Sequence, residues 1–319
     1  MTAHLAMGPG AEFDAVRALL AAWGPRARGI GDDGAVLDVP SGERLVVSTD
    51  ATVEDVHFRR GWLTAEEIGW RAAMAALSDL AAMGAAPLGL LLAVTVPEAW
   101  RPELGALAHG VGEAADRVGI PIVGGDVTTG DRLALTITVL GSAAQPVTRG
   151  GARPGDLVYV TGQLGGPGAA LAAWLRGEAP AASHRARFAR PEARLEAGRW
   201  LAAHGATAMI DLSDGLAGDA AHVAAASGVQ VTLDAACVPR LEECDAAAAL
   251  GSGEEYELLV TAPALDVAAF SLTCGGLALT PVGRVEAAPE VGPAVPIAGV
   301  DGIVPPAPRA HDHFAREIP

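Results

Sequence analysis

Apolar residues follow two different periods along this chain, and the two periods predict a mixture of helices and strands. Helical spacing of hydrophobic side chains covers residues 11–23, and a second helix is predicted from a capping box at Thr64 to Gly84. An apolar run at 88–96 and an alternating run at 133–140 predict strands. This order favours an α/β chain of the α+β type, with several strands in one layer, rather than a doubly wound sheet.

Shorter apolar runs predict the remaining strands and helices. Residues 36–39 and 44–47 are predicted to pair as strands, and the second is expected to end at Ser48-Thr49-Asp50. In the second half, the predicted strands are 157–161, 207–210, 229–233, 258–261 and 277–285, and the predicted helices are 169–176, 192–203, 216–226 and 264–273. Residues 145–155 are rich in Pro, Gly and Arg, which predicts a domain boundary there. We therefore expect two domains, 1–147 and 148–319.

Composition narrows the possible chemistry. The 319 residues carry a net charge of −16, which argues against nucleic-acid phosphate as a partner unless metal ions intervene. All 22 basic residues are Arg, so a P-loop lysine, a kinase-type lysine and a Schiff-base lysine are excluded. The three Cys residues have no metal-site or disulfide spacing, and the longest apolar run is too short to span a bilayer. We expect a cytoplasmic protein that does not enter a membrane.

One carboxylate lies where a charge is costly. Asp79 falls within the Ala-rich part of the helix that ends at Gly84, on its apolar face. An uncompensated carboxylate there would cost several kcal/mol. No basic residue occurs between Arg71 and Arg101, so the sequence offers no local partner. We interpret Asp79 as a candidate metal ligand.

Other acids share the surroundings of Asp79, because each lies beside Gly, Ser or Thr. The six candidates are Asp33, Asp50, Asp79, Asp126, Asp211 and Asp214. Four of them are predicted to follow strands, so they are expected to converge at the carboxyl ends of the strands. Carboxylate oxygens shared with ligand phosphates suit Mg²⁺. Each motif alone is weak, because Asp and Gly are common in turns and Ser213 or Asp214 would serve as an ordinary helix cap.

Taken together and in order, the motifs resemble those of the thiamine-monophosphate kinases, a family of the aminoimidazole-ribotide-synthetase-like ATP-binding superfamily. The matching stretches are GIGDD at 29–33, STD at 48–50, SDLAAMGA at 78–85, GGD at 124–126, TRGGARPGD at 148–156, IDLSDG at 210–215 and GEEYEL at 253–258. They span nearly the whole chain. Glu255 departs from the family pattern, which has Asp at this position.

The resemblance implies transfer of the γ-phosphoryl group of ATP to thiamine monophosphate by a homodimer. Its N-terminal domain would bind ATP and Mg²⁺ and form a dimer barrel through its mixed sheet, and its C-terminal α/β domain would complete the active site. Several Mg²⁺ ions would be held by Asp33, Ser48, Thr49, Asp50, Asp79, Asp126, Asp211 and Asp214. Gly125, Asp126, Arg149 and Ser213 would contact the nucleotide, and His57 and Glu254 the thiamine substrate. Asp211 would orient the acceptor through metal.

Two alternatives remain open on the sequence. A related ATP-dependent ligase or synthetase, such as a ribotide or selenophosphate synthetase, would share the same motifs. The selenium-handling version would need a reactive N-terminal Cys or selenocysteine, and the N-terminal half contains none. A regulatory protein that holds metal and nucleotide without turnover is the other alternative. ATP consumption that depends on thiamine monophosphate separates all three.

Overall fold

The structure, a computed structural model, describes residues 11–30 and 34–298. The chain forms two compact units that exchange short segments. The N-terminal unit contains the residues up to Leu80, together with Ala85–Pro146 and Ala189–Leu195. The C-terminal unit contains Ala81–Gly84, Val147–Phe188 and the residues from Glu196 onward. Each unit is built on its own sheet, and the sections below treat the two separately.

The N-terminal unit is a four-stranded mixed sheet with the strand order β1-β4-β2-β3. Its strands are β1 (Arg44–Val53), β2 (Ala86–Thr95), β3 (Ile122–Thr128) and β4 (Ala134–Ala143). Its helices are α1 (Ala11–Trp23), α2 (Ala65–Ala82) and α3 (Leu104–Val118), with 3₁₀ turns at η1 (Gly24–Arg26) and η2 (Glu98–Glu103). Strands β1 and β2 pair antiparallel with β4, and β3 pairs parallel with β2.

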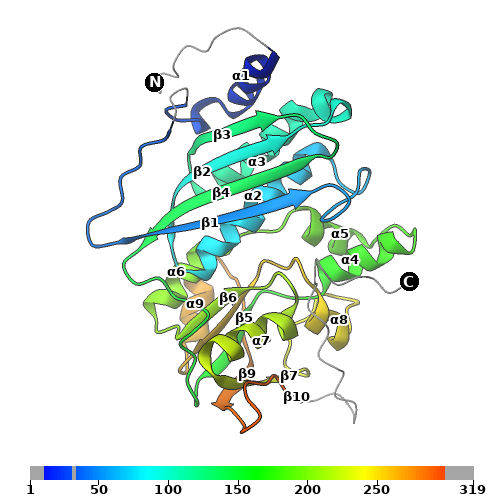
Figure 1. Cartoon of the computed structure of the whole chain (residues 1–319). Coiled ribbons are helices and arrows are strands. Elements are labelled where there is room, and N and C mark those ends of the chain that lie inside the picture. Colours follow the sequence, from blue (N-terminus) through cyan, green and yellow to red (C-terminus); the bar gives the residue numbers. More distant parts are fainter. Residues whose placement is uncertain (1–10, 31–33, 299–319) are drawn as a thin grey trace. The chain divides into compact units, whose positions relative to one another are not determined.

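Helices α2 and α3 lie on one face of this sheet (Figure 1). The predicted capping box starts α2, because the Thr64 N–H donates to Glu67 Oε2 at 2.9 Å and the Glu67 N–H donates to Thr64 Oγ1 at 3.2 Å. The two helices approach closely at Gly69 and Gly110. A Cβ on Gly110 would lie 1.9 Å from the Glu66 carbonyl oxygen, so a larger residue does not fit there.

The strand predictions in this unit hold for β2 and β4 but need correction elsewhere. Residues 36–39 are not a strand, and β1 does not end at Ser48-Thr49-Asp50 but continues to Val53. Strand β1 pairs with β4 from Arg44 to Val53, where Val53 lies opposite Ala134. Because this pairing continues past Asp50, β1 extends beyond its polar residues. Asp50 and Asp126 therefore lie within strands rather than beyond their ends.

The C-terminal unit is built on a six-stranded mixed sheet with the order β10-β7-β9-β5-β8-β6. Its strands are β5 (Leu157–Thr161), β6 (Ala208–Asp211), β7 (Val229–Asp234), β8 (Leu258–Ala262), β9 (Leu279–Ala287) and β10 (Ile297–Ala298). Its helices are α4 (Gly166–Leu175), α5 (Ala182–Ala189), α6 (Leu195–Ala203), α7 (Leu216–Ser227), α8 (Ala246–Gly251) and α9 (Val267–Thr273). Every pair in this sheet is antiparallel except β10 with β7.

Two short helices of this unit, α5 and α8, were not predicted, because their polar and Ala-rich segments carry little hydrophobic periodicity. Strands β5, β6 and β8 are buried along most of their length and lie next to one another in the sheet. The α/β class and the mixed sheet of the N-terminal unit agree with the prediction. Within the described ranges, no helix combines the length and the apolar character that crossing a membrane requires.

Candidate active site

Ser48, Asp50 and Asp79 lie on the same side of the N-terminal sheet. Alternation along β1 directs Ser48 and Asp50 to the face that carries Val46 and Thr52, which are 8% and 6% exposed. Helix α2 covers this face and contributes Asp79, whose Oδ2 accepts a 2.5 Å hydrogen bond from the Ser48 hydroxyl. The structure therefore brings three of the predicted oxygen-bearing side chains to one side of the sheet.

Thr49 and Asp126 lie on the opposite face. The Thr49 hydroxyl contacts the hydroxyl of Thr138, directly across on β4. Asp126 on β3 lies opposite Ala93 on β2. Ala93 lies opposite Thr136 on β4, and Thr136 lies opposite Ala51 on β1. In-register neighbours share a face, so Asp126 lies on the Thr49 side. Asp50 and Asp126 also lie on opposite edge strands, about 14 Å apart at the usual strand spacing.

Two further candidates in this unit have clear local roles. A Cβ on Gly125 would lie 1.9 Å from the Leu92 carbonyl oxygen, so the approach of β3 to β2 requires glycine here. The His57 ring accepts a 3.1 Å hydrogen bond at Nδ1 from the Val53 N–H, which fixes the neutral ring as the Nε2–H tautomer. Asp33 lies outside the described residues.

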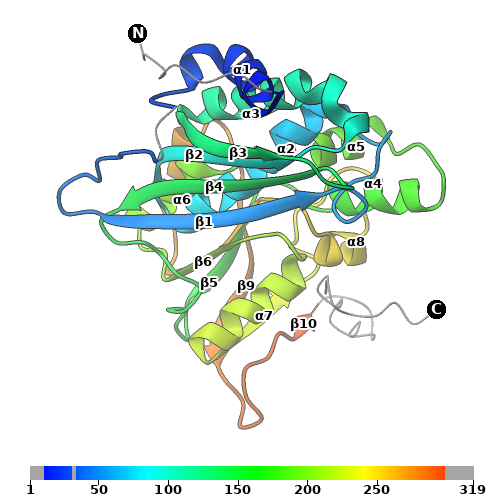
Figure 2. The same ribbon diagram turned by 45° about the horizontal axis from the view of Figure 1, so that its top comes forward.

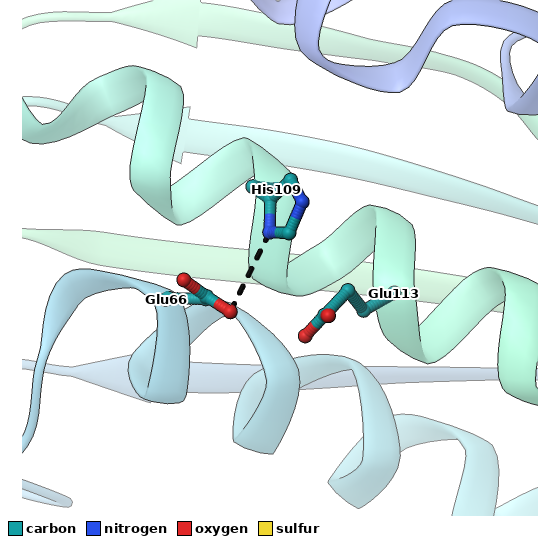
Figure 3. A group of neighbouring side chains, drawn as sticks. All are labelled: Glu66, His109 and Glu113. Carbon is teal, nitrogen blue, oxygen red and sulfur yellow. Dashed lines mark ion pairs between the residues drawn. The ribbon is translucent and has the colours of Figure 1, made fainter.

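A different acidic group, Glu66, His109 and Glu113, lies between α2 and α3 (Figure 3). His109 Nδ1 is 3.5 Å from Glu66 Oε1. Arg190 already supplies a positive charge, because its Nη2 donates to Glu113 Oε2 at 2.9 Å while its Nη1 lies 3.9 Å from Glu66 Oε1. The hydrogen bond from Arg190 lowers the pKa of Glu113. Arg190 compensates the negative charge of this group and ties the two helices to residues 189–195.

In the C-terminal unit, backbone hydrogen bonds join the two loops that carry the predicted residues. The N–H of Glu254 donates to the Ser213 carbonyl oxygen at 2.8 Å, and the N–H groups of Glu255 and Tyr256 donate to that of Leu212 at 3.0 and 2.9 Å. A Cβ on Gly253 would lie 2.6 Å from the Ser213 carbonyl oxygen, so the contact requires glycine. The motifs IDLSDG and GEEYEL therefore form one surface.

The second loop holds a strained conformation. Glu254 and Tyr256 have φ angles of 62° and 53°, in the left-handed region that non-glycine residues rarely adopt. Their side chains are paired, since the Tyr256 hydroxyl donates to Glu254 Oε2 at 2.6 Å. Such strain persists where the surroundings impose it, and it is concentrated at functional sites. The observation supports Glu254 as a ligand-facing residue.

A buried anchor lies beneath this loop. Glu255 and Glu257 have fully buried side chains and share Arg187, whose Nη2 lies 3.5 Å from Glu255 Oε2 and 3.0 Å from Glu257 Oε1. Glu255 Oε1 also accepts a 2.5 Å bond from the Gly165 N–H at the start of α4. Burial raises the pKa of Glu255 to about 7, although the Ser252 hydroxyl and Arg187 oppose that change.

The glycine-rich turn before α4, residues 162–168, uses backbone amides in contacts within the protein. Two of its amides bond to protein side chains, the Gly165 N–H to Glu255 and the Gly168 N–H to Ser252 Oγ at 2.9 Å. Arg149, in contrast, is an exposed cation beside β6, where the neighbouring Thr148 carbonyl oxygen accepts the Met209 N–H. The Arg149 guanidinium forms no ion pair with any residue within 11–30 or 34–298.

Asp219 is a residue that the sequence prediction missed. It lies in the first turn of α7, only 1% exposed, and its Oδ2 accepts 3.1 Å hydrogen bonds from the N–H groups of Ser213 and Asp214. Burial raises its pKa to about 8, against the effect of the hydrogen bond from Asp214, and the nearby charges of Asp211 and Asp214 contribute to the rise. The signal that identified Asp79, a carboxylate within an Ala-rich helix, applies equally to Asp219.

Comparisons with known proteins give consistent results. The model of the AIR synthase related protein N-terminal domain matches residues 31–143, and that of the C-terminal domain matches residues 153–295. The chain is 34% identical over 278 residues to the thiamine-monophosphate kinase of Bacillus subtilis strain 168, covering 81% of this chain and 85% of that protein.

Solved structures agree with this result. The crystal structure of thiamine-monophosphate kinase from Stenotrophomonas maltophilia K279a superimposes with a TM-score of 0.78 at 35% identity, covering 96% of this chain and 100% of that one. A structure described as AaThiL complexed with AMPPCP and TMP gives a TM-score of 0.72 at 28% identity, covering 91% of this chain and 93% of that one.

Proposed function

Because this chain belongs to the thiamine-monophosphate kinases, within the AIR synthase related proteins, we propose that it transfers the γ-phosphoryl group of ATP directly to thiamine monophosphate. The product is thiamine diphosphate. The observation that carries this function is the match to thiamine-monophosphate kinases over most of the chain, including a relative in complex with an ATP analogue and TMP. In the C-terminal unit, the hydrogen-bonded loops at 212–215 and 253–257 provide a surface for binding the substrates of this reaction.

The main difficulty of this reaction is electrostatic. The acceptor is a phosphate oxygen that is already ionised at neutral pH, so little general-base help is needed. Two polyanions must nevertheless approach each other, and the chain has no Lys to neutralise them. Bound Mg²⁺ would supply charge neutralisation and a template for the phosphates. The surface shared by Ser48, Asp50 and Asp79 fits such an ion, because its donors are hard oxygens.

The residues of the chain then take separate roles. Those that would hold several Mg²⁺ ions are Asp33, Ser48, Thr49, Asp50, Asp79, Asp126, Asp211 and Asp214. Thr49 would act through its backbone carbonyl, since its hydroxyl lies on the other face of β1. Arg149, Ser213 and the Gly125 backbone would bind the nucleotide.

Two side chains are assigned to the thiamine substrate. The Nε2–H of His57 would donate to it, and Glu254, held by Tyr256, would face it. Asp211, at the end of β6 and 5% exposed, would orient the acceptor rather than remove a proton. We infer that the groups in the two units serve one reaction, with the C-terminal domain completing what the N-terminal ATP and Mg²⁺ domain begins.

We further propose a homodimer formed through the uncovered face of the N-terminal sheet. This face carries Leu45 and Val47, which are 51% and 55% exposed, and no helix among the described residues of the unit covers it (Figure 2). A second copy of the chain would bury these side chains and close the two sheets into a barrel. Asp126 lies on the same face, so in a dimer it would lie at the interface between the two copies and away from Asp50 of its own protomer.

A labelling experiment tests the reaction. Radiolabelled ATP is supplied with thiamine, with thiamine monophosphate or with no acceptor, and the label is followed. We expect label on thiamine diphosphate only, because a neutral hydroxyl would need a base that the site does not provide. Label on the protein without acceptor would show a phosphoenzyme, and equal labelling of thiamine would show that the acceptor phosphate is unimportant. Turnover with neither acceptor would favour one of the synthetase alternatives.

A further inference from the structure

The turn after β6 depends on a side chain that lies outside it. Residues 212–215 belong to no helix or strand, yet they contain Ser213 and Asp214 of the proposed site. The N–H groups of these two residues point at the same oxygen, Asp219 Oδ2, at 3.1 Å each. Within the described ranges, Asp219 makes no other side-chain hydrogen bond.

A carboxylate at this position is not needed to start the helix. Helix α7 begins after Gly215, whose φ of 102° makes the bend, and no side chain caps it. The first helical bond joins the Asp219 N–H to the Gly215 carbonyl oxygen at 2.9 Å. Asp219 is 1% exposed, and a buried carboxylate close to Asp211 and Asp214 is costly. The two hydrogen bonds to the turn are therefore the contacts that this carboxylate provides.

We propose that Asp219 is a positioning residue for the kinase reaction, which holds the backbone of Ser213 and Asp214 so that the turn presents these two residues to Mg²⁺ and nucleotide beside Asp211. Two hydrogen bonds to one fixed oxygen set the orientation of two consecutive peptide groups. The Asp214 side chain then projects from a fixed backbone. The metal part of this inference rests on the function proposed above.

The experiment must distinguish positioning by Asp219 from direct metal binding by Asp219. Asp214, Asp219 and His222 have ligand atoms within 4.8 Å of one another, so Asp219 would be a metal ligand if this group bound an ion. The two roles differ in what the side chain must provide. Positioning needs one acceptor oxygen, which an Asn retains, whereas metal binding needs the negative charge, which an Asn lacks.

The experiment compares Asp219→Asn, Asp219→Ala and His222→Ala with the wild-type chain. Amide hydrogen exchange at Ser213 and Asp214 reports the two bonds directly, without any ligand. Calorimetry with Mg²⁺ and a non-hydrolysable ATP analogue reports metal binding without turnover. We expect Asp219→Ala to expose both amides and weaken Mg²⁺ binding about tenfold, as loss of a capping bond does. Asp219→Asn should protect both amides and stay within about threefold of wild type, and His222→Ala should bind as wild type does.

Three results would overturn the inference. Asp219→Asn binding Mg²⁺ as weakly as Asp219→Ala, with His222→Ala equally weak, would make Asp219 a ligand. Faster exchange in Asp219→Ala with unchanged Mg²⁺ binding would show that the turn does not position the site. Unchanged exchange in Asp219→Ala would show that the bonds do not hold the turn. A wild-type chain that bound neither Mg²⁺ nor nucleotide would instead overturn the proposed function, and the exchange data would still decide whether Asp219 holds the turn.

Discussion

In the N-terminal unit a strand and a helix present Ser48, Asp50 and Asp79, whereas in the C-terminal unit the end of a strand and the turn after it present Asp211 and Asp214. The strand and helix have their own backbone hydrogen bonds, so side-chain direction there follows from strand alternation and helical spacing. The turn has no such ladder. Its direction depends on bonds to the 253–257 loop and to Asp219. Acidic side chains are therefore positioned by regular structure in one unit and by tertiary contacts in the other.

The largest effect is expected from Asp79→Asn, because Asp79 is held rigidly by α2 and bonded to Ser48. Loss of a metal-binding charge should reduce Mg²⁺-dependent turnover by about a thousandfold or more. The fold should persist, and the melting temperature in chelator should be unchanged or higher, since a half-buried charge is removed. Turnover against Mg²⁺ and thermal melting are measured together. Asp131→Asn, at an exposed position, is the control, and wild-type turnover in Asp79→Asn would remove Asp79 from the site.

Mixed dimers test whether Asp50 and Asp126, on opposite faces of the N-terminal sheet, act in the same protomer or across the dimer. If the dimer forms as proposed and Asp126 acts across its interface, Asp50→Asn and Asp126→Asn should each be inactive alone. A heterodimer of the two variants should recover about half the wild-type rate, because one of its two sites combines intact residues from both protomers. Differently tagged chains are co-expressed, purified as heterodimers and assayed. Sedimentation should first show a dimer of twice 32.1 kDa.

The matched control pairs Asp50→Asn with Asp79→Asn, which lie on the same side of the sheet. That heterodimer should stay inactive, because each site keeps one damaged residue. An inactive Asp50 and Asp126 heterodimer would mean that Asp126 does not act across the dimer.

A smaller effect, on stability, tests the buried anchor of the C-terminal loop. The pKa of Glu255 is raised to about 7 from 4.5, so its favourable contribution is complete below about pH 4.5 and is lost as the pH rises through 7. Glu255→Gln keeps an oxygen for the Gly165 N–H and cannot ionise. It should match wild type at pH 4.5 and exceed it by about 3 kcal/mol in free energy of unfolding at pH 8.

Denaturant titrations at pH 4.5, 6, 7 and 8 measure this difference. Glu290→Gln, at an exposed position, serves as the control and should follow wild type at every pH. A constant difference between Glu255→Gln and wild type would mean that Glu255 does not ionise in this range.

The smallest effect is expected in the helix that carries Asp79. Ser78 Oγ is fully buried and has no hydrogen-bond partner among the described residues. Ser78→Ala removes this unmet hydroxyl and introduces the best helix former, so it should raise the free energy of unfolding by about 1 kcal/mol. Urea titration measures the change. Destabilisation would show that the hydroxyl makes a contact that this structure does not contain.

The sequence by itself determined the residue types of the site and the elements with a strong local signal. The capping box at Thr64 and the apolar runs of β2 and β4 act within a few residues, so their patterns were sufficient. The motif series also indicated the family, because its order along the chain is specific even though each motif is weak. The individual metal, nucleotide and substrate roles remain predictions.

Only the tertiary structure decided which of these residues lie together. Where β1 ends depends on its partner β4, and the face on which Asp126 lies depends on the register between β3 and β2. Asp219 bonds to the turn at Ser213 and Asp214, and the Glu254 N–H bonds to the Ser213 carbonyl oxygen. The local sequence around each of these residues does not predict its partner. Register and loop contacts are set by long-range packing, and no local period in the chain encodes them.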